Sequence, residues 1–146
     1  MLLALLALAW SKGHGDKPTR AERGLEWIGA TDQGRQVRAV TVHGVVTSLT
    51  TRVTTHCTNG STWTLRLTMP ADSFGQTGEV VHGRQGPTAS VSDQREPVVV
   101  ATRLHGVMGE RPTGTIASEV TRRPGPKALY CNSYNVAYVL HRPTTH

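Results

Sequence analysis

Residues 49–69, LTTRVTTHCTNGSTWTLRLTM, give the clearest indication of how this chain folds. Apolar or β-branched residues occupy every second position over 49–57, and polar residues fill most of the positions between them. The alternation resumes over 63–69, after Asn59-Gly60. Successive side chains of a strand point to opposite faces, and Asn-Gly between two alternating runs is a strong hairpin signal. The stretch therefore predicts an antiparallel hairpin with one buried and one solvated face.

The chain from Leu25 onward has the same β character, because Thr and Val dominate it and helical periodicity is absent. Further β-rich runs alternate with expected turns. The runs are 37–42, 79–82, 89–92, 98–104, 114–121 and 133–141, and the turns are His43-Gly44, Gly83, Gly86-Pro87, Glu96-Pro97, Gly106, Pro112–Gly114 and Pro124–Pro126. Strands of this length and spacing predict an all-β fold, either an antiparallel β-sandwich or a closed barrel of about eight strands.

The 146 residues suit one domain, which we expect at 25–142, with a tail at 143–146. Residues 1–9 form an apolar run that is too short to cross a bilayer. The run resembles a truncated or unusually short secretory signal, although a positively charged start is missing; a short amphipathic or buried helix is the alternative. Residues 10–24 are mostly polar or charged and contain Gly and Pro, so we expect them to form a flexible lead-in. We therefore expect a secreted or cell-surface protein whose mature chain begins near Trp10 and has no transmembrane span.

The two cysteines, Cys57 and Cys131, have three interpretations. A zinc site would need companion ligands at short spacing, and neither the Cys nor the His pattern supplies them. His56 adjoins Cys57, but neighbours on a strand point to opposite faces. In an exported β-domain, two cysteines far apart in sequence most simply form one disulfide, which would stabilise the fold by roughly 4 kcal/mol. Free structural thiols and thiol chemistry are the alternatives.

Several segments together resemble a group of small secreted actinobacterial proteins. They are Gly29–Gly34 (GATDQG), the strand at 37–42, the strand ending at Cys57, Gly114–Ala117 (GTIA) and Cys131–Tyr138 (CNSYNVAY). The likeness covers about 29–142, and its motifs are turns and cysteines. It implies a compact β-sandwich with bridged cysteines, in a group without an assigned activity.

The chain departs from the pattern of that group at two places. Asn135 stands where the group often has Gly, and the loop at 77–97 is longer. With these departures the resemblance still implies the disulfide, but it does not define the details of the middle strands.

The net charge is +6, with 13 Arg and only 3 Lys. A basic chain suits acidic partners such as nucleic acid, anionic glycans, wall polymers or lipid headgroups; solubility alone is the alternative. Arg52 and Arg66 lie on the polar faces of adjacent predicted strands, and Arg103 lies on a third. We predict these three residues as a candidate anionic-ligand face, with an ordinary solvated face as the alternative. No aromatic residues alternate with them, so stacking on single-stranded nucleic acid is not expected.

Histidines and acids give little sign of chemistry. His43, His82 and His105 each precede glycine, which is typical of turn entry. A metal site would require such imidazoles to converge, and their spacing does not indicate this. No G-x-S-x-G motif is present, and the acids are sparse. We therefore predict no metal, no cofactor and no catalytic residues.

The function expected from the sequence is binding rather than catalysis, by a secreted or surface-associated domain whose partner is an anionic wall polymer, a glycan or another protein. Trp27, Trp63 and Tyr138 alternate like core residues and are expected inside rather than on a sugar platform, whereas Tyr134 could serve either role. One alternative is a small extracellular hydrolase or lyase with an acid and a His converging in a pocket. The other is an inhibitor-like module that uses the loop 85–96.

Overall fold

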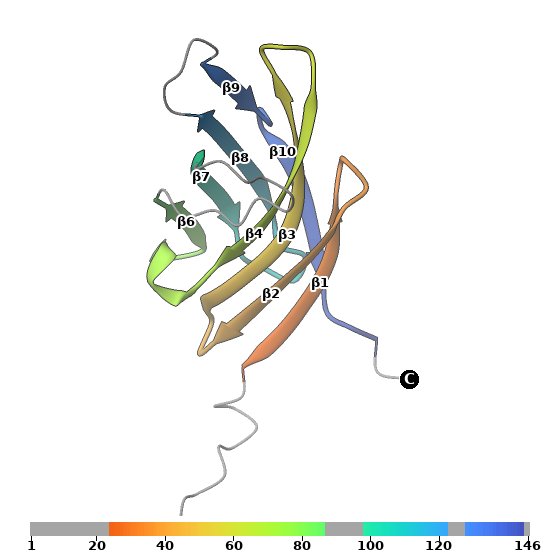
Figure 1. Ribbon diagram of the computed structural model, residues 1–146. Coiled ribbons are helices and arrows are strands. Elements are labelled where there is room, and N and C mark those ends of the chain that lie inside the picture. Colours follow the sequence, from red (N-terminus) through yellow and green to blue (C-terminus); the bar gives the residue numbers. More distant parts are fainter. Residues whose placement is uncertain (1–23, 87–97, 123–127, 145–146) are drawn as a thin grey trace, which may run out of the picture.

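The computed structural model describes residues 24–86, 98–122 and 128–144 (Figure 1). The segment 1–9, nearly all of the lead-in and the predicted run 89–92 lie outside these residues. The described residues form ten strands and one short 3-10 helix, η1. They are β1 Leu25–Thr31, β2 Gln36–Val42, β3 Val45–Cys57, β4 Thr62–Met69, η1 Ala71–Ser73, β5 Phe74–Thr77, β6 Val80–Gln85, β7 Val98–Val107, β8 Thr113–Arg122, β9 Leu129–Asn132 and β10 Val136–His141.

Six of the strands close into an antiparallel barrel, in the order β1, β2, β3, β9, β8 and β10, with β10 returning to β1. The remaining four extend the sheet outward: β4 pairs with β3, and β7, β6 and β5 continue from β8. Figure 1 shows β1–β4 as one curved layer in front of β6–β8. The all-β prediction is confirmed, and of its two forms the closed barrel is the one observed. Six strands close the barrel and four more extend its sheet, so the described residues form ten strands where about eight were predicted.

The hairpin predicted from residues 49–69 is confirmed as β3 and β4. Inward positions such as Val53 and Leu65 are almost fully buried, and the intervening Arg52 and Arg66 are exposed. At the turn, the Gly60 N–H donates to the Cys57 carbonyl at 2.9 Å. Gly60 has φ +82°, a conformation that glycine adopts at little cost. The hairpin therefore follows from local signals alone.

The prediction that Gly83 and Gly106 mark turns is wrong, because both lie inside strands and face the core. A Cβ at Gly106 would collide with the hydroxyl of Tyr138. A Cβ at Gly83 would lie 3.0 Å from Cε of Met69 and 3.2 Å from Cβ of Leu104. Glycine occurs here because the core approaches the backbone closely, not because the chain turns.

The turn-entry prediction for His82 and His105 is wrong for the same reason. Each precedes an inward glycine and therefore points outward from the middle of its strand, in β6 and β7. Gly114, predicted both to end a turn and to open the run 114–121, lies within β8, so the run is the part of the prediction that holds. His43 does lie in a turn, between β2 and β3, with φ +50°.

The last predicted strand, 133–141, begins three residues later than expected, and a separate short strand precedes it. Cys131 lies in β9, and β10 begins only at Val136. Between them Tyr134 has φ +56°, which breaks the extended conformation. The Ser133 N–H donates to the Ser118 carbonyl at 2.9 Å, and the Ser133 Oγ accepts from the Ser118 N–H at 2.8 Å. Both short strands thus remain attached to β8.

Gln33 completes the barrel wall where two strands leave a gap. On β3, the pairing with β2 ends at Thr51 and the pairing with β9 begins at His56. In this interval the Gln33 side chain donates from Nε2 to the Thr54 carbonyl at 3.0 Å and accepts at Oε1 from the Thr54 N–H at 2.8 Å. One side-chain amide thus takes the place of a strand residue, since it offers both a donor and an acceptor.

The barrel interior is filled with side chains. Trp27 and Tyr138 are buried as predicted, and Trp63 is partly buried against the same cluster. The cavity that borders Trp27, Leu104 and Tyr138 has a volume of about 10 Å³, which is about the least that one water needs. The interior is therefore a core rather than a ligand cavity.

Burial of Tyr138 makes a pH-dependent contribution to stability that can be measured. Burial raises the pKa of Tyr138 to about 12 from the ordinary value of 10.0. The folded state holds the proton more tightly than the unfolded state, so this contribution is intact below pH 10 and is lost between about pH 10 and 12. Urea unfolding at pH 9 and 11 should show a fall in unfolding free energy of about 1 kcal/mol, and Tyr138→Phe should show a smaller fall. Equal falls in the two proteins would contradict this assignment.

Candidate anion-binding surface

Arg52 and Arg66 lie side by side on the outer face of the layer β1–β4. They occupy directly opposite positions of the β3–β4 pairing, where Cβ atoms lie about 5 Å apart. Both point outward because their strand neighbours face the core. Arg52 and Arg66 therefore lie on the polar face of adjacent strands, as the alternation predicted.

Two further arginines join them to form what we call the arginine groove. Arg38 stands on β2, opposite Thr50 of β3, and Arg35 lies in the β1–β2 turn. The groove is open, with a volume of about 580 Å³. Its lining consists of Gly34, Arg35, Gln36, Arg38, Thr50, Thr51, Arg52 and Arg66.

The positive charge of the arginine groove is little neutralised. Within the described residues, Arg38 alone of the four arginines has an acidic partner, Glu26, at 3.8 Å. Both side chains of that pair are more than half exposed, so the pair contributes little. Like charges at directly opposite sheet positions repel. Arg52 and Arg66 therefore repel each other across the β3–β4 pairing.

Arg103 does not belong to this surface. It lies on β7, directly opposite Arg84 of β6, and its Nη2 is 3.2 Å from Oε1 of Glu119. It lines a second open groove of about 680 Å³ across β5–β8. The three arginines predicted as one face are thus divided between two surfaces, because Arg103 is carried by the other layer of strands.

The second groove, which we call the histidine groove, holds two imidazoles and a carboxylate. His82 and His105 occupy opposite positions of the β6–β7 pairing, with ring centroids 5.0 Å apart. Asp72 of η1 lines the same groove. An acid and two histidines thus line the same groove, and the hydrolase alternative, which needs an acid and a His to converge, stays a prediction. The inhibitor-like alternative depends on 85–96, of which only Gln85 and Gly86 lie among the described residues.

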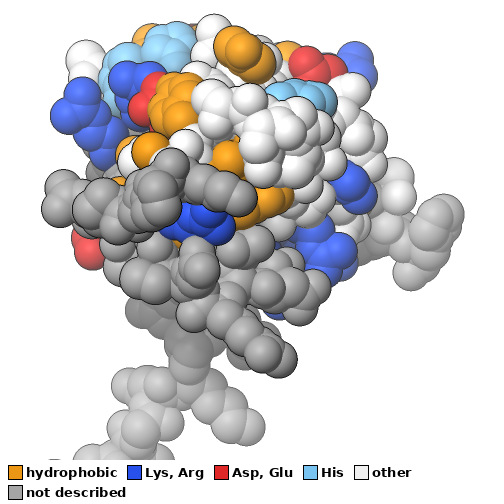
Figure 2. Space-filling model, turned by 45° about the horizontal axis from the view of Figure 1, so that its top comes forward, with side chains coloured by type: hydrophobic (Ala, Val, Ile, Leu, Met, Phe, Trp, Pro, Cys, Tyr) orange, Lys and Arg blue, Asp and Glu red, His pale blue; other side chains and the backbone are white. Residues whose placement is uncertain are grey.

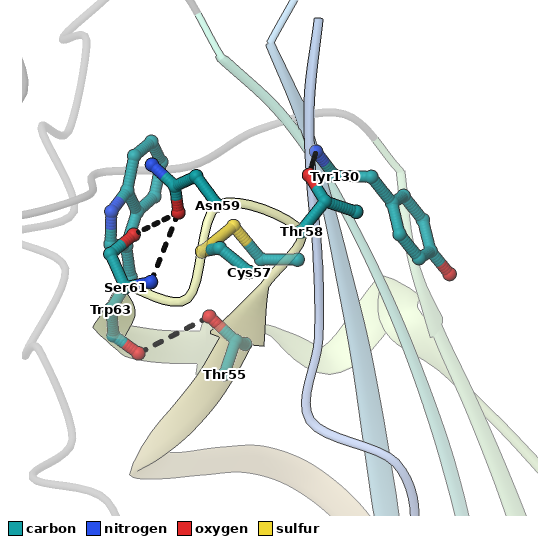
Figure 3. Close-up of a disulfide and its surroundings, with 8 residues drawn as sticks. Thr55, Cys57, Thr58, Asn59, Ser61, Trp63 and Tyr130 are labelled. Carbon is teal, nitrogen blue, oxygen red and sulfur yellow. Dashed lines mark hydrogen bonds between the residues drawn. A yellow bond between two sulfur atoms is a disulfide. The ribbon is translucent and has the colours of Figure 1, made fainter.

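Of the three interpretations of the cysteines, the disulfide is confirmed: Cys57 and Cys131 are bonded to each other. The two residues face each other in the β3–β9 pairing, at a sequence separation of 74. Figure 3 shows the bridge with Asn59 and Trp63 on one side and Tyr130 on the other. Neither sulfur is a free thiol, so the interpretations as thiol ligand and as nucleophile do not apply to this state.

Exposed aromatic residues gather near the bridge. Tyr134 is 69% exposed and Tyr130 is 41% exposed. Of its two predicted roles, Tyr134 is therefore not a core residue. Figure 2 is turned by 45° so that the top of Figure 1 comes forward, and in that view Arg side chains are more prominent than Asp and Glu side chains.

No three His, Cys, Asp or Glu residues within 24–86, 98–122 and 128–144 come close enough together to hold a metal ion. Over the same ranges, none of the helical structure is long and apolar enough to cross a bilayer.

Arg35 and Arg38 were not predicted as site residues. The alternation over 37–42 places Arg38 on the outer face, so its outward direction could have been read from the sequence. The order of the strands could not, because it depends on how residues far along the chain close the ring. In comparisons with protein families, curated proteins and solved structures, no match to this chain was found.

Proposed function

We propose that this protein is a secreted or surface-associated, non-enzymatic domain that binds a linear anionic polymer along the arginine groove. The observation that supports this most is the direct opposition of Arg52 and Arg66, with Arg35 and Arg38 beside them. An anion that lies between Arg52 and Arg66 replaces a repulsion with two attractions. A polymer suits the site because several weak contacts on one chain act together.

The geometry favours an extended ligand. Neighbouring strands lie about 4.8 Å apart, so the arginines of β2, β3 and β4 span about 10 Å across the sheet. The groove is open rather than enclosed, and Thr50 lines it between the charged side chains. Sulfate, phosphate or carboxylate groups repeated along a flexible chain would meet successive guanidinium groups, which bind such groups with paired N–H donors.

An extracellular location is part of the same proposal. The Cys57–Cys131 disulfide supports it, because disulfides persist in oxidising compartments and are rare in the cytosol. Wall polymers and acidic glycans are found in such compartments, and a basic domain suits them.

Loss of both central arginines should weaken binding to a polyanion. We expect R52Q/R66Q to bind heparin, used as a sulfated probe, about 10-fold or more weakly at low salt, since each exposed charge contact contributes up to about 1 kcal/mol. The dependence of affinity on salt should also become shallower, because fewer charges are screened. Isothermal titration over a series of NaCl concentrations measures both quantities.

Arg111→Gln is the matched control for the single variant R52Q. Arg111 is exposed and lies outside the arginine groove, so it changes the net charge equally at another place. The proposal requires R52Q to weaken heparin binding clearly more than R111Q. Equal effects would show that the net charge alone attracts the polymer, and the arginine groove would then have no special role.

A further inference from the structure

His82 and His105 form a pair whose function the arginine groove does not explain. They face each other on β6 and β7, and their rings lie 5.0 Å apart at an interplanar angle of 65°. Both residues are exposed. Within the described residues, neither imidazole has a hydrogen bond or an ion pair. Their nitrogen atoms are therefore available to a ligand.

The distance between the rings suits two ligands of one metal ion. A metal lies about 2.0–2.1 Å from an imidazole nitrogen, and therefore about 3.2 Å from the centre of the ring. Two such rings are separated by about 4.5 Å at a 90° ligand angle and about 5.2 Å at a tetrahedral angle. The observed 5.0 Å lies between these two values. Rotation of an exposed ring about its soft χ2 torsion can then aim both nitrogens at one point.

The backbone beneath the two histidines is held firmly. β6 and β7 are paired from Val80–Val107 to Gln85–Thr102, and β7 is paired with β8 along its whole length. The inward neighbours Gly83 and Leu104 are buried. A site carried by paired strands is pre-organised, so little ordering is needed when the ion binds.

We propose that His82 and His105 form a two-imidazole site for a divalent late first-row transition ion. Cu²⁺ should bind most tightly, since such sites follow the order in which Cu²⁺ exceeds Ni²⁺ and Zn²⁺. Water completes the coordination, because the described residues supply no group of three metal-binding side chains. Asp72 of η1 lines the same groove.

The two arginines beside the histidines oppose metal binding and provide a second test. Arg84 and Arg103 lie two residues along the same strands and line the same groove. Their positive charge repels a cation, and Glu119 partly offsets that of Arg103. Removal of the charge of Arg84 should therefore strengthen Cu²⁺ binding about two- to five-fold at low salt.

The experiment is a Cu²⁺ titration of the whole chain, followed by electron paramagnetic resonance and by calorimetry. We expect H82Q and H105Q each to weaken the site at least 10-fold, and Arg84→Gln to strengthen it. The control is His56→Gln, which removes an exposed histidine of β3 outside this groove and should leave the site unchanged. Because all these side chains are exposed, unfolding free energies without metal should agree within about 0.5 kcal/mol.

The outcomes separate clearly. Loss of one nitrogen-coordinated Cu²⁺ signal in H82Q and in H105Q, but not in H56Q, supports the site. Copper held elsewhere on the chain persists in the H82Q/H105Q double variant and can be subtracted. A double variant that titrates like the unaltered protein, or an equal loss in H56Q, would overturn the proposal.

Discussion

Replacing both Cys57 and Cys131 with alanine should lower the free energy of unfolding by about 4 kcal/mol. The bridge closes a loop with a sequence separation of 74, and such a cross-link removes much of the conformational freedom of the unfolded chain. The disulfide also holds two strands together in the folded state. The β3–β9 pairing consists of two residue pairs, one of which is the disulfide itself. Without the bridge, this part of the barrel wall is held mainly by β8.

Urea unfolding of oxidised protein, reduced protein and the double variant measures this contribution. Reduced protein and the double variant should have closely similar stabilities, since both lose the same cross-link. A loss below about 1 kcal/mol, well short of the chain-entropy value, would contradict the prediction. It would indicate that the pairing of β9 with β8 and the Ser133–Ser118 contacts hold this end of the barrel without the disulfide.

Gly29→Ala should be the most damaging small substitution in the barrel, with a loss of about 3 kcal/mol in unfolding free energy. Gly29 lies in β1 between β2 and β10. A Cβ at this position would collide with the carbonyl oxygen of Val139 and lie 3.0 Å from Cα of Leu140. Both are backbone atoms, so no side-chain rotation relieves the contact, and the β1–β10 pairing that closes the ring must move.

Gly75→Ala is the matched control, because it adds the same methyl group to another strand. Gly75 lies in β5, and the nearest atom that a Cβ would meet, the His82 carbonyl oxygen, is 4.0 Å away. We expect its stability to change by less than about 0.5 kcal/mol. Thermal and urea unfolding of the two variants provide the comparison. Similar stabilities for G29A and G75A would show that β10 tolerates displacement from β1.

The part of the candidate site that lies on one hairpin could be predicted from the sequence, and the part that depends on contacts between distant strands could not. Arg52 and Arg66 are joined by a short hairpin, so their shared face follows from alternation and one turn. Arg103 lies on β7, and its position relative to them depends on how the sheet closes. The meeting of His82 and His105 depends on the β6–β7 register, which the residues of neither strand specify alone.

The glycines show why local patterns were insufficient. A glycine after a histidine is typical of a turn, and His43-Gly44 is one. Gly83 and Gly106 belong to strands instead, because side chains distant in sequence, such as Tyr138, approach their backbone. Such contacts leave no mark in the neighbouring residues.

The sequence by itself determined the β class, the central hairpin and the inward or outward direction of its side chains. These features depend on a period of two residues and on turn chemistry, which act between neighbours. Only the tertiary structure decided that the sheet closes through β10 and β1, that Gln33 fills the gap beside Thr54, and that the cationic residues divide between two grooves. These features depend on register and close packing between distant segments, where the contacts of the whole barrel compete and no single stretch of chain holds the answer.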